Sequence, residues 1–187
     1  MNKQYLVIIL LVFLILSCDQ HKKPLSFYDY SELNEDSVEF SNDQYDTMIA
    51  LHSTESISVP FIEQNGVKLI DVMVNQKITV KMVLDSGCST TLISMAEANY
   101  LYEKGDITQD DILGITQSQI ADGSLMENMV INLRELTIGG KIVCTNVTAV
   151  VSANTQAPLL LGNEILNRVP SYSVDNQNKV LIFNLGE

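Results

Sequence analysis

The stretch of sequence that decides the fold runs from Val80 to Ser94 and reads VKMVLDSGCSTTLIS. An apolar strand, Val80–Leu84, leads directly into Asp85, and apolar residues resume shortly after. A carboxylate between two core-type runs is costly to desolvate unless it is hydrogen-bonded, shares a proton or has a chemical use. Gly87 allows backbone N–H groups to approach this carboxylate, and Ser86 offers a hydroxyl that fixes the loop. Asp85 is therefore the candidate chemical group, with an ordinary turn as the alternative.

Two later segments carry similar signals. Ala121-Asp122-Gly123-Ser124 lies between apolar runs, about 36 residues beyond Asp85. Further on, residues 159–166 read LLLGNEIL and place Gly162 between an apolar run and a short helical pattern.

Together, these three segments resemble the retropepsin-like aspartic proteases, in particular their short single-domain bacterial members. Leu84–Ser89 stands where that family has an apolar residue, Asp-Thr-Gly or Asp-Ser-Gly, a small residue and Ser. Residues 121–124 resemble the hairpin flap that closes over the substrate, and residues 159–166 resemble the segment that supports the catalytic loop. The resemblance spans Val59 to Leu185. It implies an all-β fold: a small closed β-barrel with one or two short helices.

The resemblance also implies a role for each matching residue. Asp85 would be the catalytic acid and base, Ser86 would bond across a two-fold axis, Gly87 would permit the tight turn, and Ser89 would orient the carboxylate. Gly162 would leave room beneath the loop, and the flap residues Ala121, Asp122, Gly123 and Ser124 would hold the substrate main chain. This chain departs from the family at Cys88, where Ala is usual, and at Asp122, which adds a negative charge near the site.

Peptide hydrolysis by carboxylates needs two of them close together, one as base and one as acid. The chain has one Asp-Ser-Gly motif, and neither Asp122 nor Asp175 has its apolar flanks. We therefore expect the second Asp85 to come from another copy of the chain, in a two-fold symmetric homodimer. Two adjacent carboxylates share one proton and titrate as a pair.

The residues that other hydrolytic mechanisms require are not found in the expected domain. The two histidines, His21 and His52, lie before the expected domain, so we expect neither a serine hydrolase nor a zinc site. Nothing near Cys88 or Cys144 would form a thiolate nucleophile. No Gly-rich phosphate loop is present, and we expect no cofactor or metal.

Short apolar runs separated by turns predict strands over Gly66–Val74, Gln76–Leu84, Met126–Ile138, Lys141–Val151 and Lys179–Leu185. Gly139-Gly140 predicts a two-residue hairpin turn. Ser94–Lys104 predicts a short helix with Ser94 near its N-cap, and a second, shorter helix is expected after Gly162.

The N-terminus has the pattern of an export signal. After Lys3, residues 5–16 are an apolar run too short to cross a bilayer. Ile15-Leu16-Ser17-Cys18 resembles the lipobox of bacterial lipoproteins, which implies cleavage before Cys18 and lipidation of its sulfur (diacylglycerol and palmitate). We expect a protein of the bacterial cell envelope, lipid-anchored to a membrane. An uncleaved anchor and an ordinary export signal are the alternatives.

The three expected regions are a signal peptide at 1–17, a lipidated Cys with an acidic tether at 18–58, and the protease domain at 59–187. Residues 19–58 carry nine acids, and all nine glycines lie at Gly66 or later. The tether also holds five aromatic residues; we expect a tether with transient contacts, with a segment that docks on the domain or binds a partner as the alternative.

Composition narrows the partners. The 187 residues carry a formal charge of −12, which disfavours nucleic acid. Cys88 and Cys144 are expected to be free thiols, with a disulfide as the alternative.

Three functions follow, in order of preference. The first is a homodimeric aspartic endopeptidase that acts on extended peptides. The second is a non-catalytic lipoprotein that binds a peptide or an envelope partner on the same fold. The third is a plain β-barrel whose aromatic-rich tether is the functional element.

Overall fold

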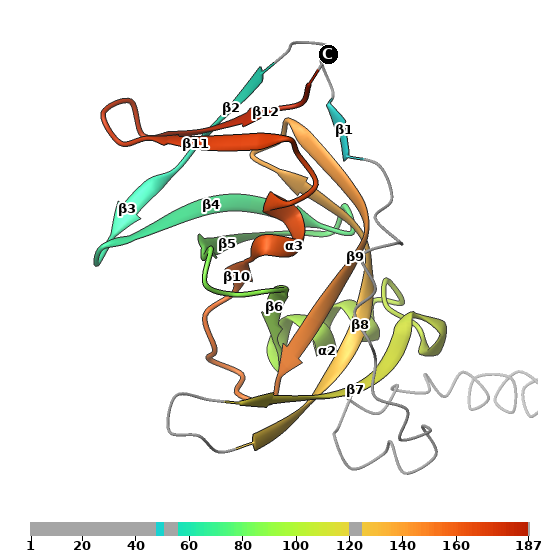
Figure 1. The fold of residues 1–187 in the computed structure, drawn as a ribbon. Helices are drawn as coiled ribbons and strands as arrows, with labels where there is room; N and C mark the ends of the chain where they lie inside the picture. Colours follow the sequence, from blue (N-terminus) through green and yellow to red (C-terminus); the bar gives the residue numbers. More distant parts are fainter. Residues whose placement is uncertain (1–47, 51–55, 120–124, 187) are drawn as a thin grey trace, which may run out of the picture.

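The computed structural model describes residues 48–50, 56–119 and 125–186, which form mostly strands (Figure 1). The strands are β1 (Met48–Ala50), β2 (Ser56–Pro60), β3 (Ile62–Gln64), β4 (Val67–Val74), β5 (Ile78–Leu84), β6 (Thr91–Ser94), β7 (Ile112–Gln119), β8 (Leu125–Ile138), β9 (Ile142–Ser152), β10 (Leu160–Leu161), β11 (Ser171–Asp175) and β12 (Val180–Asn184). The helices are α2 (Met95–Glu103) and α3 (Asn163–Leu166), with a 3₁₀ turn, η3 (Gln109–Asp111).

The main sheet closes on itself. Its strands follow the order β1-β9-β6-β10-β5-β4-β8-β7, and β8 also pairs with β9. Hydrogen bonds therefore run in a ring from β9 through β6, β10, β5, β4 and β8 back to β9. This ring confirms the predicted all-β class with a small closed sheet. A separate three-stranded sheet, β11-β12-β2, lies beside it at the top of Figure 1.

The core is formed by side chains that alternate along the strands between the inner and outer face. In β4, Ile70, Val72 and Val74 are buried, with less buried residues between them, as expected for a strand with one face inward. Met82 of β5 and Leu133 of β8 are also fully buried. The inner faces of the ring therefore meet in one apolar cluster.

The predicted long strands all form, within one to two residues at most ends. The hairpin also forms, with left-handed φ values of 56° and 67° at Gly139 and Gly140 and a hydrogen bond of 3.0 Å from the Lys141 N–H to the Ile138 carbonyl. The first paired residues are Ile138 and Ile142, so the connection has three residues and not the predicted two. Helix α2 has the predicted N-cap, since the Ser94 hydroxyl accepts a hydrogen bond from the backbone N–H of Ala96. Helix α3 follows Gly162 as expected.

Strand β1 lies within the residues assigned to the tether, and β2 begins within them. Residues Met48–Ala50 pair antiparallel with Ile142–Cys144 of β9, and β2 begins at Ser56, three residues before the expected domain boundary. Several expectations fall outside the described residues: the signal peptide 1–17, lipidation of Cys18, most of the tether, and the flap residues Ala121, Asp122, Gly123 and Ser124. No helix among the described residues has the length and apolar character needed to cross a membrane.

Candidate active site

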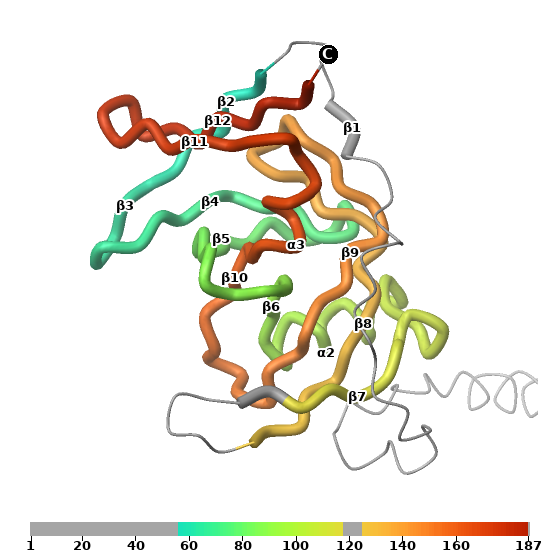
Figure 2. Tube along the Cα trace, viewed as in Figure 1, coloured from blue at the N-terminus to red at the C-terminus, as the bar shows by residue number. Residues whose placement is uncertain are grey.

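Asp85 follows directly after β5, at the start of the loop that leads to β6. Two-residue strand β10 lies between these strands: Leu161 pairs with Leu84 in parallel, and Leu160 pairs antiparallel with Leu92. In the view of Figure 2, this loop lies between the β7–β8 hairpin on one side and the β11–β12 hairpin on the other. The ring of strands thus delivers Asp85 to an open face of the molecule.

The loop folds around the Asp85 carboxylate. The backbone N–H of Gly87 donates to Asp85 Oδ1 at 2.9 Å, which is an Asx turn. The N–H of Cys88 donates to the Asp85 carbonyl at 3.2 Å, and the N–H of Asp85 donates to the Leu161 carbonyl at 3.1 Å. A Cβ on Gly87 would lie 3.1 Å from Oδ1, tighter than almost all such contacts. Asp85 is half-buried, and the two residues that follow it, Ser86 and Gly87, are exposed.

The segment after β10 holds this loop from the far side. The backbone N–H of Asn163 donates to the Cys88 carbonyl at 2.8 Å, and its side-chain amide donates to the Ser86 carbonyl at 2.7 Å. The N–H of Glu164 donates to the Ser89 carbonyl at 3.0 Å. These bonds fix the backbone of the loop at three positions, so its shape depends on where α3 lies.

Gly162 lies beneath the same loop. A Cβ at this position would overlap the Thr90 carbonyl oxygen and lie 2.7 Å from that of Cys88. Both are backbone atoms that side-chain rotation cannot move away. Position 162 therefore has room for glycine alone, the arrangement that the family resemblance implies.

Glu164 and Arg168 form an ion pair that sequence reasoning did not identify. Arg168 Nη2 lies 2.7 Å from Glu164 Oε1, and the two side chains are only 2% and 8% exposed, respectively. The signal in the sequence was an acid and a base at i,i+4 within residues 163–168, NEILNR, directly after the apolar run that ends at Leu161. Burial raises the pKa of Glu164, while Arg168 and hydrogen bonds from Thr148 and Thr91 act in the opposite direction.

Both cysteines in the described residues are free thiols, as expected. Cys88 is half-buried, and its Sγ lies 3.1 Å from the Thr90 carbonyl oxygen, to which the thiol donates. Cys144 is fully buried, and burial raises the pKa of its thiol to about 12. The buried Cys144 thiol is therefore protonated at neutral pH.

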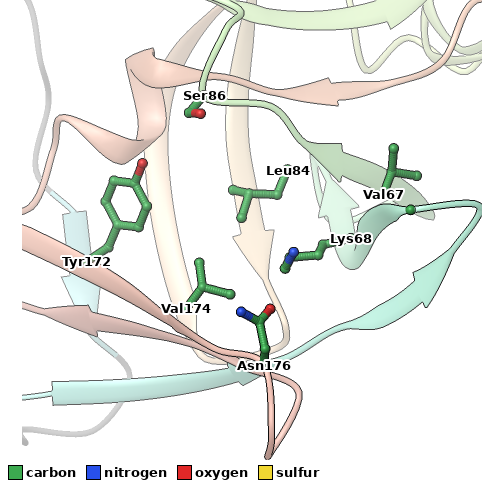
Figure 3. Close-up of a pocket in the computed structure, with 8 residues that line it drawn as sticks. Val67, Lys68, Leu84, Ser86, Tyr172, Val174 and Asn176 are labelled. Atoms are coloured by element: carbon green, nitrogen blue, oxygen red, sulfur yellow. The ribbon is translucent and has the colours of Figure 1, made fainter.

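A pocket with a volume of about 290 Å³ opens beside Ser86 (Figure 3). Its walls come from the β3–β4 hairpin, the end of β5, and β11 with the turn that follows. In Figure 3, Lys68 and Asn176 point into the hollow, and Leu84 and Val174 form apolar walls. The pocket lies on the β11 side of the Asp85 loop, since Tyr172, Val174 and Asn176 line it and no described residue of β7 or β8 does.

The structure also places the other candidate residues, Ser86, Ser89 and Asp175. Ser86 and Ser89 are exposed residues of the same loop as Asp85. The Asp175 carboxylate is used in its own turn, where it accepts hydrogen bonds from the backbone N–H groups of Gln177 and Asn178. In the parts of the chain that the structure describes, no cluster of three or more His, Cys, Asp or Glu side chains suits a metal ion.

Comparison with known proteins agrees with this geometry. Residues 70–168, which are 99 of the 187, match the family model described as gag-polyprotein putative aspartyl protease. Among solved structures, the chain is similar to a retropepsin-like aspartic protease from Rickettsia conorii. That match has a TM-score of 0.51 and 21% sequence identity, and it covers 69% of this chain and 89% of the other. The search of curated proteins gave no match. The chain thus belongs to the family of gag-polyprotein putative aspartyl proteases, with the retropepsin-like fold.

Proposed function

We propose that this protein is an aspartic endopeptidase whose catalytic residue is Asp85. The observation that carries the proposal is the arrangement around this one carboxylate. It lies half-buried on an open face, in a loop held by backbone hydrogen bonds from Gly87 and from the β10–α3 segment. Such a loop presents its acid in a fixed position, which general acid–base catalysis requires.

A second copy of the chain supplies the other carboxylate in this proposal. Glu164, the acid whose backbone contacts the loop, is already paired with Arg168, and Asp175 is used in its turn. Asp85 of each copy would then meet on a two-fold axis, where the pair shares one proton.

The reaction follows from that pair. The ionised carboxylate takes a proton from water, whose oxygen attacks the carbonyl carbon of the peptide. The protonated carboxyl gives its proton to the carbonyl oxygen, which yields a tetrahedral diol. Transfer of a proton to the amide nitrogen then breaks the C–N bond and releases an acid and an amine.

The face that carries Asp85 has features suited to a second copy. Strand β11 pairs with β12 alone among the described strands, so its outer edge is open for pairing. A two-fold axis brings such an edge against its own copy in antiparallel register. The pocket beside Ser86 borders this edge, and Val67 at its rim is 41% exposed. We infer that the dimer forms across β11 and this pocket.

Cleavage of a peptide library by the full chain, measured from pH 3 to pH 7, tests the proposal. The wild type should cleave, and Asp85→Asn should not. Asp71→Asn is the matched control, because it makes the same change in an exposed ion pair with Lys81 on the outside of the ring. Cleavage retained by Asp85→Asn would reject Asp85 as the catalytic residue. A wild type that binds peptides without cutting them would support a binding lipoprotein instead.

We also infer that a lipid on Cys18 anchors the protein in the bacterial cell envelope, from the lipobox-like residues 15–18. Metabolic labelling with a palmitate analogue should mark the wild type and the Cys88→Ser control. Cys18→Ser should lose the label and leave the membrane fraction. Label retained by Cys18→Ser would contradict lipidation at this residue.

A further inference from the structure

Helix α3 is too short to hold itself in place. It has four residues, and an isolated helix of that length is unstable in water because nucleation costs more than one or two hydrogen bonds return. Yet the backbone N–H groups of Asn163 and Glu164 fix the loop that carries Asp85. Some other interaction must therefore set the position of α3.

The Glu164 side chain provides that interaction. Its Oε1 accepts a hydrogen bond at 3.3 Å from the backbone N–H of Thr148 in β9. Its Oε2 accepts one at 3.4 Å from the hydroxyl of Thr91, which is fully buried in β6 directly after the catalytic loop. One carboxylate thus links α3 to two strands of the closed ring.

Arg168 holds the carboxylate from the other side. Its Nη1 donates to the Thr145 carbonyl at 2.7 Å and its Nη2 to the Asn146 carbonyl at 3.1 Å, while Nη2 also contacts Glu164. Asn146 has a φ of 48°, and β8 and β9 have no registered pair at this position. The irregular backbone of β9 thus presents two successive carbonyls to one guanidinium.

The energy of this arrangement argues for a positional role. Two charges buried to this degree lose most of their hydration, and apolar side chains of similar size often give equal or greater stability. Hydrogen bonds are directional and fix one geometry, whereas the packing contacts of apolar side chains do not. The ion pair joins α3, β6 and β9, the three elements that surround the back of the catalytic loop.

We propose that Glu164, oriented by Arg168, is a positioning residue for Asp85. It acts along two routes: through its own helix to the Cys88 and Ser89 carbonyls, and through Thr91 to the end of the loop. The effect of Glu164 on catalysis rests on the proposed endopeptidase function, whereas its effect on the geometry of the loop does not.

The test replaces both charges together, because removing one alone leaves the other buried without a partner. Glu164→Leu/Arg168→Leu should fold with a urea midpoint near that of the wild type. Its kcat should fall about 10- to 100-fold while KM changes little, since the binding surface remains but the carboxylate is misplaced. Glu164→Gln keeps an acceptor for Thr148 and Arg168, so it should retain most of the activity.

A second readout does not depend on activity. Cys88 lies within the loop, so the rate of its alkylation by iodoacetamide, read by mass spectrometry of its own peptide, reports loop opening. This rate should rise several-fold in the double variant. Asp111→Asn/Arg134→Met is the matched control, because it removes another pair with a buried carboxylate, on η3 and β8. The control should leave the Cys88 rate and kcat unchanged.

The outcomes separate the two proposals. If the wild type cleaves no peptide but the double variant alkylates faster at Cys88, the endopeptidase proposal fails and the positioning role stands. If the folded double variant matches the wild type in both Cys88 alkylation and kcat, the positioning role is rejected while the endopeptidase stands. A kcat loss without faster alkylation would also contradict a role that acts through the loop.

Discussion

Gly162 and Thr90 are so close that a methyl group on Gly162 would overlap the Thr90 carbonyl oxygen. The carbonyl belongs to the last residue of the Asp85 loop before β6, so it cannot move without moving the loop. This contact fixes how tightly β10 packs under the loop, and it makes the side chain at position 162 a direct probe of that packing.

Gly162→Ala should therefore cost about 2–3 kcal/mol of unfolding free energy, the upper part of the range for forcing extra volume into packed structure. Any cleavage activity should fall with it. Gly140→Ala is the control, because it has φ of 67° with nothing within 4 Å of its Cβ and should cost about 1 kcal/mol. Urea denaturation measures both. Equal costs for the two variants would show that the loop yields to the methyl group.

Asp111 should make stability depend on acid pH. Burial acts to raise the pKa of Asp111, but hydrogen bonds from Arg134 and Thr108 outweigh it and hold that pKa below the usual value. Because the unfolded chain takes up this proton first, the contribution is complete above about pH 4 and is lost as the pH falls through the folded pKa.

Asp111→Asn should thus lower the unfolding free energy at pH 7 by about 1–3 kcal/mol, and the difference from wild type should narrow at pH 3. Urea denaturation at the two pH values checks this. Asp71→Asn, in an exposed pair, should cost under about 1 kcal/mol at either pH. A wild-type advantage that grows on acidification would contradict the sign of the shift.

Cys144 should resist alkylation in the native protein. Burial raises the pKa of its thiol to about 12, so almost no thiolate exists at pH 8, and its side chain has no exposed surface. Iodoacetamide labelling followed by mass spectrometry should show reaction at Cys144 only at urea concentrations that unfold the chain. Modification in native buffer, faster than global unfolding, would reveal a local opening of β9.

Val67→Lys should weaken the proposed dimer. Val67 lies at the rim of the pocket on the Asp85 face and is 41% exposed, so a lysine there would fold without strain but place two like charges across the axis. Leu113→Lys makes the same change at a 45% exposed site on β7. Sedimentation velocity should show a dissociation constant raised about tenfold or more by Val67→Lys alone. Equal values for both variants would place the interface elsewhere.

The sequence predicted the elements whose signals lie within a few neighbouring residues. The five long strands alternate or run apolar between turn residues, and Ser94 and Gly139-Gly140 are local signals for a cap and a turn, so each formed where expected. Asp85 was found because an acid between two apolar runs conflicts with burial. Strand β10 gave no comparable signal, since it has two residues and is a strand only because β5 and β6 lie on either side of it.

Local sequence patterns also did not predict the interactions that support the site. Glu164 and Arg168 stand one turn apart, like many surface pairs, and nothing in that spacing shows that β9 would bury them. The pocket is built from strands more than 100 residues apart, Lys68 on β4 and Asn176 after β11. Such sites depend on the register of strands that meet only in the folded ring.

The insertion of β10 between β5 and β6 sets an order for folding during synthesis. The bonds that shape the Asp85 loop come from residues 161–164, and the amide of Asn163 reaches Ser86 across 77 positions of sequence. A nascent chain therefore carries its aspartate in an unformed loop until residues 161–164 have left the ribosome. Contacts between residues so far apart in the sequence form late and slowly. Any chemistry of the Asp85 loop would therefore begin only after the segment around α3 has been synthesised and has folded against it.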